Sequence, residues 1–447
     1  ATFAAYGPSC NTWPVIHLPG GTKQTPGSQE SKMAVETRTK PAHALAGTIM
    51  SGAEIIIQVL ADEGVRTIFG YSGGAILPTY DAVFRYNEAH AEDGKEPIPL
   101  IVPANEQGAG FMAAGYARAS GGVGVAIVTS GPGATNCVTP VRDCMADSVP
   151  IVVICGQVPR AAIGTDAFQE ADHMALMRSI TKHAMTVNRA ERIPELFRHA
   201  FRLAMSGKKG PVFIDIPRDL LETQEMEVEV ASPQSYRMHH RPPGDPELVR
   251  QAATLLRGAQ RPLIIAGGGV SLAGASDELL ELAELMSMPV ATTHIAHGTF
   301  PTDHPLCAHV VGSANAGNRG RIANKIIEDS DTVLLIGTRM DARTTNSWTL
   351  PTPGTKIVQI DADGDGQHTS PREYARREIQ RAKGSLANVI AALKPYDQAV
   401  AAQAASLLHE AGHDPRSGPL GQALKPAAPM VRAGFDTYAA TLPAAKE

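Results

Sequence analysis

Short apolar runs of strand length, alternating with helical stretches, restrict the fold of this chain more than any other feature of its sequence. In the first half they occupy residues 67–69, 100–102, 123–128, 150–154 and 211–216. These runs are apolar at successive positions, whereas a strand with one face in water alternates apolar and polar residues. Strands buried on both faces and separated by helices predict a parallel sheet covered on both sides, which is an α/β fold.

A second set of runs follows a polar, proline-bearing stretch. Its members are residues 262–266, 288–292, 332–336 and 356–360, and they alternate with helical patterns such as residues 277–286. We therefore predict two doubly wound parallel-sheet domains, residues 48–222 and 246–395, joined by a linker at residues 223–245. Ser51 and Glu54 form a potential capping box, which places an amphipathic helix at the start of the first domain.

The two ends of the chain lack this pattern. Residues 1–47 are rich in Ser, Thr, Gly and Pro and contain no apolar core of the kind that a secretory signal needs. We predict a disordered extension there, with a plastid or mitochondrial transit segment as the alternative. Residues 396–447 are rich in Ala, Pro, Gly and His and too irregular for a further α/β domain, so we predict a disordered C-terminal extension.

Composition narrows the choice of partners. Lys and Arg number 40 against 45 Asp and Glu, and the formal net charge of -5 is not the basic field that nucleic acid or an anionic membrane selects. The five cysteines form no CxxC pair, and the longest apolar runs fall far short of the about 20 residues that span a bilayer. We expect a cytoplasmic protein whose partner is a small molecule or another protein, with no nucleic acid and no membrane.

Three motifs are candidates for binding or catalysis. The turn at residues 131–133, Gly-Pro-Gly, follows a strand and opens a helix, so it could bring N–H groups close to an anion or a ring, although a structural turn is the simpler explanation. Residues 267–269, three glycines, lack the GxGxxG spacing and favour a structural turn. Glu106 precedes a helix at residues 111–118, where its carboxylate suits the helix dipole; a desolvated carboxylate could instead exchange a proton with a ligand nitrogen. The residues alone leave these alternatives open.

Histidines and cysteines are weaker candidates. Four histidines fall within sixteen residues, but no nearby Cys or Glu has helical ligand spacing, so we do not predict a metal site there: His294, His297, His304 and His309. Three cysteines lie in apolar settings and have no His at fixed spacing, so we predict buried small apolar groups and not nucleophiles: Cys137, Cys144 and Cys155.

Several longer segments carry a specific family pattern. Residues 123–136, 147–150, 156–159 and 163–170 resemble the catalytic subunit of acetohydroxyacid synthase (acetolactate synthase), and the pattern continues through residues 179–183 and 210–217. The resemblance covers residues 48 to about 365 and implies a thiamine diphosphate enzyme. Such enzymes have a pyrimidine-binding domain, a Rossmann-like central domain and a domain that binds the diphosphate with Mg²⁺. Their active sites lie between subunits, which implies a homodimer or a higher oligomer.

The resemblance also implies a reaction. Enzymes of this family decarboxylate pyruvate and join the remaining two-carbon unit to a second 2-ketoacid, pyruvate or 2-ketobutyrate, in branched-chain amino acid biosynthesis. Two other functions stay open. The chain could belong to another thiamine diphosphate-dependent decarboxylase or acyl transferase, or it could be a non-catalytic partner of a full-length synthase.

Site residues follow by position in the family pattern. Glu106 would activate the cofactor by hydrogen bonding to its aminopyrimidine ring. The cofactor would be bordered by Pro132, Gly133 and Asn136 and also by Gly73 and Gly74, which together with Ala75 would border its reacting carbon. Phe168, Gln169 and Lys182 would line the substrate entrance, with Gln169 and Lys182 as catalytic candidates. In the segment 337–343, Arg339 would meet FAD and Arg343 would reach the substrate carboxylate.

The chain also departs from the family pattern. Asn105 stands where the family has His, Ser72 where it has Pro, and Arg218 where it has Lys. Residues 312–320 and Ala342 do not reproduce the flavin-binding pattern, so FAD is left open.

The magnesium motif of the family, Gly-Asp-Gly followed about thirty residues later by Asn, has no counterpart. Residues 364–366 are predicted to form a turn, and Asn388 comes too soon after them. We therefore assign no metal ligands and expect Mg²⁺ to be supplied by a missing domain. The chain would then be truncated, would pair with a separate diphosphate-binding polypeptide, or would be a regulatory or binding partner.

Overall fold

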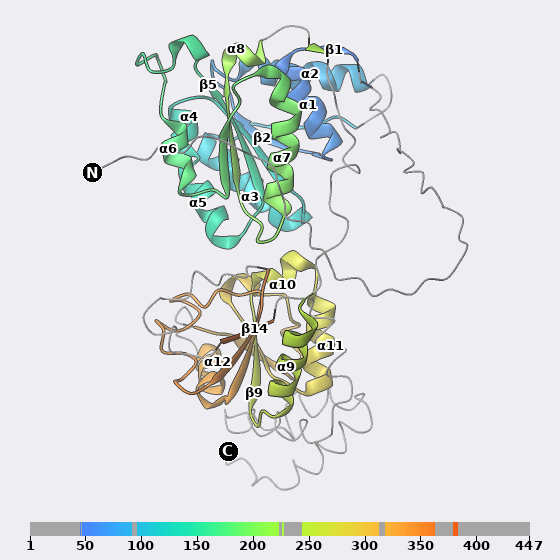
Figure 1. Ribbon diagram of the computed structural model, residues 1–447, viewed down its shortest axis with the longest axis vertical. Helices are drawn as coiled ribbons and strands as arrows, with labels where there is room; N and C mark the ends of the chain where they lie inside the picture. Colours follow the sequence, from blue (N-terminus) through green and yellow to red (C-terminus); the bar gives the residue numbers. More distant parts are fainter. Residues whose placement is uncertain are drawn as a thin grey trace, which may run out of the picture. The chain divides into compact units, whose positions relative to one another are not determined.

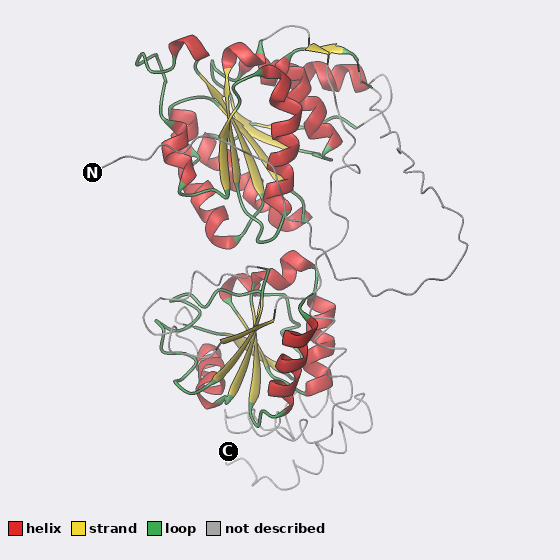
Figure 2. Cartoon of the chain, viewed as in Figure 1, coloured by secondary structure: helices red, strands yellow, loops and turns green. Residues whose placement is uncertain are grey.

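The computed structural model describes residues 45, 47–91, 96–222, 226–227, 244–312, 318–362 and 379–382. Figures 1 and 2 show two α/β domains, each built around one central sheet, and each is described here by itself. Most of the predicted linker, nearly all of the predicted N-terminal extension and the whole of the predicted C-terminal extension lie outside the described residues.

The first domain contains a six-stranded sheet in which every neighbouring pair is parallel, with the order β3-β2-β4-β5-β7-β6. The strands are β2 (Ile68–Tyr71), β3 (Leu100–Ile101), β4 (Gly124–Val128), β5 (Ile151–Gln157), β6 (His183–Thr186) and β7 (Val212–Pro217). A separate antiparallel pair joins β1 (Ile49–Met50) to β8 (Met226–Glu227). The doubly wound sheet that the sequence predicts for this domain is confirmed.

Helices cover both faces of this sheet (Figure 1). One apolar core lies beneath α1 (Gly52–Asp62), α2 (Leu77–Ala91), α7 (Ile193–Met205) and α8 (Arg218–Leu221). The other lies beneath α3 (Glu106–Ser120), α4 (Pro132–Asn136), α5 (Val138–Asp147) and α6 (His173–Arg178). Successive residues of β5 alternate between the two cores because strand side chains point to opposite faces, so every residue of this strand is buried.

Local sequence explains where the key helices begin. The capping box is confirmed: the Ser51 hydroxyl accepts from the Glu54 backbone N–H, and the Glu54 carboxylate accepts from the Ser51 N–H at 2.8 Å. Helix α3 begins at Glu106, five residues before the predicted start, because the Asn105 side chain caps it by accepting from the Gly108 N–H at 2.8 Å. The Asn that departs from the family pattern therefore has a structural role.

The second domain has the sheet order β11-β10-β9-β12-β13-β14, and every neighbouring pair is parallel. Its strands are β9 (Pro262–Ala266), β10 (Val290–Thr292), β11 (Cys307–Val310), β12 (Thr332–Ile336), β13 (Lys356–Ile360) and β14 (Ile379–Ala382). Helices α9 (Pro246–Arg257), α10 (Gly268–Ala273) and α11 (Ser276–Met286) pack over one core, and α12 (Asn318–Asp329) packs over the other. This order is that of the Rossmann fold, as predicted for the central domain.

Every strand predicted from an apolar run is present, but three strands of the two large sheets were missed. These are β6, β11 and β14, and each is a terminal strand of its sheet. An edge strand has one open side and does not need a continuous apolar run, and β6 (sequence His-Ala-Met-Thr) has a single fully buried residue.

Among the helices of the described ranges, none combines the length and the apolarity that a membrane span requires.

Candidate active site

The topology of the first domain indicates where a ligand would bind. The chain passes from β2 to β3 on one side and then returns to place β4 on the other side of β2. Ligands of open α/β sheets bind beyond the carboxyl ends of the strands at such a reversal. The loops that follow β2 and β4 meet there: a Cβ added to Gly73 would lie 2.5 Å from the Thr129 Cβ.

A buried carboxylate lies at this point. Glu106 is only 7% exposed, and its Oε2 accepts a hydrogen bond of 2.8 Å from Nδ2 of Asn136, the last residue of α4. Its charge affects two neighbours. Burial first, and then the negative Glu106, raise the pKa of the Cys137 thiol to about 12, and the same two causes raise the pKa of Tyr80. The fold thus joins two candidate residues that lie 30 positions apart.

The turn at residues 131–133 brings backbone close to this carboxylate. A Cβ on Gly133 would lie 2.9 Å from the Thr129 Cγ2 and 3.6 Å from the Glu106 Oε1. Gly131 has φ of 56° and ψ of −110°, and a Cβ there would lie 2.6 Å from the Gln169 carbonyl oxygen. Both glycines are therefore required by close approach, and the backbone of Gln169 lies beside the turn.

The polar groups at this point suit an aminopyrimidine ring. Thr129 is 4% exposed, and its hydroxyl Oγ1 is buried with no hydrogen-bond partner; it lies between the glycines of the two loops. Within the described residues the second Glu106 oxygen, Oε1, also receives no hydrogen bond. A ring that carries both a protonated nitrogen and an amino group could satisfy such acceptors, because buried polar atoms are normally paired.

Other predicted residues of this domain surround the same loops. Ala75 is buried with its backbone against Gly156 at the end of β5, whereas a Cβ on Gly74 would meet nothing within 4 Å. Pro132 is the exposed first residue of α4. Phe168 is 88% exposed, on a loop closed by the Glu170 carboxylate, which accepts from the backbone N–H of Gly164 and Ala167.

Lys182 is not brought to Glu106 within this chain. It precedes β6, at the amino end of the parallel sheet, whereas Glu106 lies at the carboxyl end. Its ammonium donates to the carbonyl oxygens of Leu203 and Ser206 at the end of α7, the latter at 2.7 Å. Burial lowers the pKa of Lys182, and these carbonyls explain its position without a substrate.

The central domain holds the two predicted arginines in the loop after β12. Arg339 is half-buried, and Arg343 is exposed, with its carbonyl oxygen 2.0 Å from where a Cβ on Gly312 would lie. At the reversal between β9 and β12, a Cβ on Gly267 would lie 2.2 Å from the Gly337 carbonyl oxygen. This backbone contact accounts for the glycines of residues 267–269 as a structural turn, and it does not by itself indicate a flavin.

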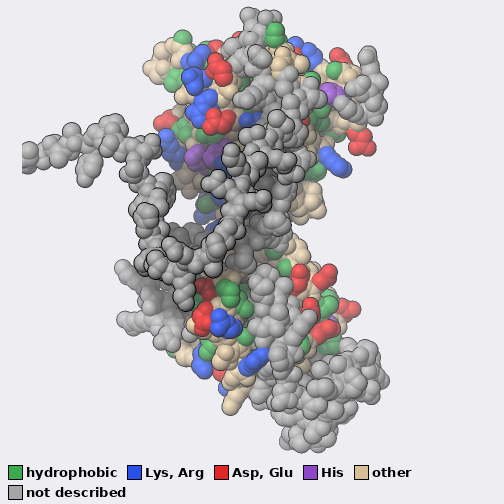
Figure 3. Space-filling model, turned by 45° about the vertical axis from the view of Figure 1, so that its right-hand side comes forward, with side chains coloured by type: hydrophobic (Ala, Val, Ile, Leu, Met, Phe, Trp, Pro, Cys, Tyr) green, Lys and Arg blue, Asp and Glu red, His purple; other side chains and the backbone are tan. Residues whose placement is uncertain are grey.

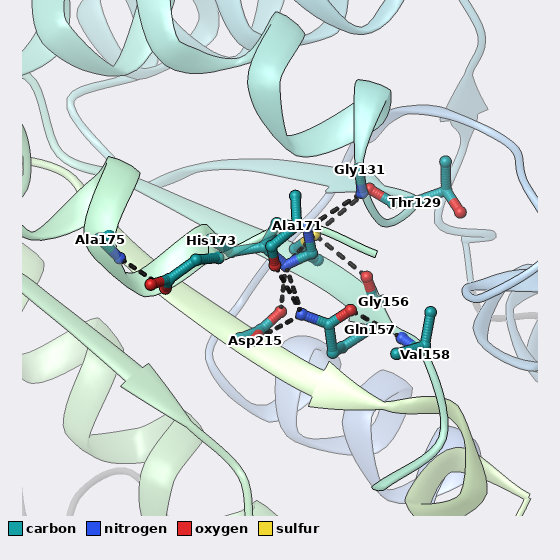
Figure 4. Close-up of polar contacts among 11 residues, drawn as sticks. Thr129, Gly131, Gly156, Gln157, Val158, Ala171, His173, Ala175 and Asp215 are labelled. Carbon is teal, nitrogen blue, oxygen red and sulfur yellow. Dashed lines mark hydrogen bonds and ion pairs between the residues drawn. The ribbon is translucent and has the colours of Figure 1, made fainter. Parts of the chain in front are cut away.

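One polar cluster was missed by the sequence prediction. Cys155, His173 and Asp215 converge in the first domain, with ligand-capable atoms all within 4.8 Å of one another (Figure 4). The prediction that Cys137, Cys144 and Cys155 are buried is confirmed. Spacing along the chain did not reveal the neighbour of Cys155, whose Sγ lies 3.8 Å from Nδ1 of His173 on another element.

Two thiamine pyrophosphate enzyme families match the chain. The N-terminal TPP binding domain matches residues 50–176, and the central domain matches residues 249–373. A probable acetolactate synthase large subunit of Methanocaldococcus jannaschii is 43% identical over 320 residues, which are 70% of this chain and 51% of that protein. The isozyme 3 large subunit of Escherichia coli acetolactate synthase is 37% identical over 318 residues, 70% of this chain and 53% of that protein.

An acetolactate synthase of Arthrospira platensis is similar to the same extent, with 41% identity over 317 residues, 70% of this chain and 53% of that protein. The chain spans about half the length of the curated relatives that it matches. Both matched families and both sheet topologies agree with the geometry described above. The chain therefore belongs to the thiamine pyrophosphate enzymes, of which it carries the N-terminal TPP binding domain and the central domain.

Proposed function

We propose that this chain forms the cofactor-activating part of an acetolactate synthase-like carboligase that depends on thiamine diphosphate. The observation that carries the proposal is the buried Glu106 carboxylate, held by Asn136 beside the turn at residues 131–133. The names of the relatives favour this activity over that of another thiamine diphosphate-dependent decarboxylase or acyl transferase.

The residues of this chain would bind and orient the pyrimidine ring. Glu106 would hold a proton at a ring nitrogen through Oε1, and the Thr129 hydroxyl, which has no protein partner, would pair with a polar edge of the ring. Gly73 and Gly133 let both loops approach the Thr129 side chain closely, because a Cβ would lie 2.5 Å from it at Gly73 and 2.9 Å from it at Gly133. Thiamine diphosphate, when bound, supplies the carbon nucleophile and the electron sink for decarboxylation.

The substrates that we propose are 2-ketoacids, pyruvate as donor and pyruvate or 2-ketobutyrate as acceptor. Gln169 lies beside the turn and Phe168 is exposed next to it, so these two residues are the proposed substrate contacts of the first domain. For Lys182 and Arg343 we also propose contacts with the substrate. These contacts would form at a site shared with another chain. We propose that Mg²⁺ binds to the oxygens of the cofactor diphosphate and that FAD binds at the loop that contains Arg339. The proposed location is the cytoplasm.

Donor profiling tests the activity. The complete polypeptide, or this chain together with any polypeptide that completes it, would be supplied with thiamine diphosphate and Mg²⁺. We expect acetolactate from pyruvate alone and acetohydroxybutyrate when 2-ketobutyrate is added. Aldehyde without either acid would support another decarboxylase. Association with a full-length synthase but no turnover would support a non-catalytic partner.

We also propose a homodimer formed through the β3 edge of the first domain. Large apolar side chains are exposed on β2, α2, β3, the residue after β3, and α3, which surround that edge: Tyr71, Leu77, Phe84, Ile101, Val102, Phe111 and Met112. Exposed apolar side chains gathered around one open edge of a sheet can mark an association site. The face drawn in Figure 3 carries Lys and Arg side chains interspersed with Asp and Glu.

Charged substitutions at this edge should dissociate the dimer. Phe111 and Met112 are each 43% exposed, and Phe111→Glu with Met112→Glu would place four charges in the symmetric interface. We expect the dissociation constant to rise roughly 100-fold or more, because burial of such side chains contributes about 1.5–3 kcal/mol each. Sedimentation measures the mass. Met205→Glu, at the end of α7, is the matched control and should stay dimeric; an unchanged mass in the double variant would contradict the proposed interface.

A further inference from the structure

The polar cluster beneath the turn at residues 131–133 is almost completely buried. His173 is 1% exposed, Asp215 3%, Gln157 5% and Cys155 0%. These residues come from the start of α6 and from the adjacent strands β5 and β7, and Figure 4 shows His173, Gln157 and Asp215 pointing toward one another. An unpaired polar group inside such a cluster would destabilise the fold. We therefore expect each polar side chain of the cluster to have a hydrogen-bond partner.

The hydrogen bonds determine which nitrogen of His173 carries the proton. The backbone N–H of Gly131 donates to Nε2 at 2.9 Å, so Nε2 is an acceptor and carries no hydrogen. In the neutral ring Nδ1 then carries the hydrogen and donates to Oδ1 of Asp215 at 2.8 Å. Gln157 Oε1 accepts from the Val158 N–H, which leaves the Gln157 amide nitrogen to donate to the Ala171 carbonyl oxygen at 3.2 Å and to Oδ2 of Asp215 at 3.4 Å. The same nitrogen lies 3.1 Å from Nδ1 of His173, a contact between two donors in this assignment.

A metal ion is the competing explanation of the same atoms, since Cys155, His173 and Asp215 are all ligand types for zinc. An ion among them would bind Nδ1 of His173 and move the hydrogen of the neutral ring to Nε2. That hydrogen would then face the Gly131 N–H across 2.9 Å, donor against donor. The contact with Gly131 therefore favours the hydrogen-bonded pair over a metal site.

The contact with Gly131 leads directly to the candidate active site. Gly131 has a backbone conformation that residues with a Cβ rarely adopt, and its carbonyl oxygen accepts the first backbone hydrogen bond of α4, from the Thr135 N–H at 3.0 Å. Asn136 ends this short helix and donates to Glu106 at 2.8 Å. A shift of Gly131 would therefore move the side chain that holds the Glu106 carboxylate.

We infer that His173 is a positioning residue: the neutral His173–Asp215 pair holds Gly131 and, through α4, sets the position of Asn136 against Glu106. The consequence for catalysis rests on the proposed function. The hydrogen bond to Gly131 does not, because it is a property of the chain without cofactor. Cys155 packs against the pair and keeps its thiol protonated, since burial raises its pKa well above the usual range.

Two substitutions of His173 separate its two contacts. The Asn amide reaches about as far as Nδ1 and keeps a donor for Asp215, whereas the longer Gln reaches about as far as Nε2 and keeps an acceptor for Gly131. Amide hydrogen exchange of the full chain, followed for residues 130–137, is the readout. We expect about 10-fold or faster exchange in His173→Asn and near wild-type exchange in His173→Gln. The opposite order, or equal exchange in both, would overturn the inference.

Two measurements that leave His173 in place keep the inference testable if both His173 variants unfold. The ¹⁵N chemical shifts of the His173 ring should report hydrogen on Nδ1, and hydrogen on Nε2 would overturn the assignment. Metal analysis after exposure to Zn²⁺ should find no stoichiometric zinc that Cys155→Ala removes; such zinc would establish the metal site instead. Neither readout uses turnover, so a failure of the proposed carboligase activity would be seen separately.

Discussion

Glu106→Gln should lower acetolactate formation by at least about 100-fold in the complete enzyme, because the amide keeps the size of the side chain but cannot hold a proton for the cofactor ring as a carboxylate does. Glu106 is buried at 7% exposure and is bound by Asn136, so the amide can stay in place and the fold should be retained. The measurements are steady-state rates and the exchange of the cofactor C2 proton, followed by NMR.

A matched control for this substitution is Glu195→Gln. Glu195 is an exposed carboxylate on α7, paired with Arg192 on the same surface. Exposed pairs of this kind contribute little to stability, so the control should keep wild-type rates. Equal, wild-type rates in both variants would remove Glu106 from the proposed mechanism. Loss of rate together with a changed circular dichroism spectrum would show instead that Glu106 is needed for the fold.

Gly131→Ala should destabilise the first domain by more than about 3 kcal/mol, the second large effect. The new Cβ would lie 2.6 Å from the Gln169 carbonyl oxygen, a backbone atom that cannot move alone. The φ of 56° with ψ of −110° adds about 1–3 kcal/mol for any residue with a Cβ. The urea midpoint of the transition that involves this domain measures the effect, through the linear dependence of unfolding free energy on denaturant.

Gly121→Ala separates the two causes of this loss. Gly121 ends α3 with φ of 72°, and a Cβ there would meet nothing within 4 Å. It should cost only about 1 kcal/mol, the conformational cost of a left-handed residue other than glycine. If the two substitutions shifted the midpoint equally, the close approach of the Gln169 carbonyl to Gly131 would not be a constraint on the turn.

Local patterns were sufficient for most of the fold. Apolar runs predicted the central strands because those strands are buried on both faces, and the Ser51 capping box marked the start of α1 because its hydrogen bonds join residues three positions apart. The edge strand β6 was not predicted, because one face and one side of an edge strand tolerate polar residues. The start of α3 was misplaced because the capping role of Asn105 was not recognised.

In the candidate site, too, some features could be predicted from local sequence and others could not. The Gly-Pro-Gly turn and the Glu106 position were visible because each follows a strand directly, and the family resemblance supplied a role for them. Lys182 was assigned to the substrate entrance from its place in that pattern, and this role stays a prediction. In the fold Lys182 lies at the amino end of the sheet, where the carbonyls that end α7 bind it. A position along the chain does not determine which end of a sheet a side chain reaches.

By itself the sequence determined the α/β class, the two sheets, the turn that opens α4 and the presence of a carboxylate between β3 and the next helix, because each depends on residues within one or two helical turns of each other. Only the tertiary structure decided that Asn136 binds Glu106, 30 residues away, and that His173 joins Gly131 to Asp215 across 42 residues in each direction. Such contacts arise from the parallel order of the strands, which brings the ends of β4, β5 and β7 together, and no spacing along the chain encodes them.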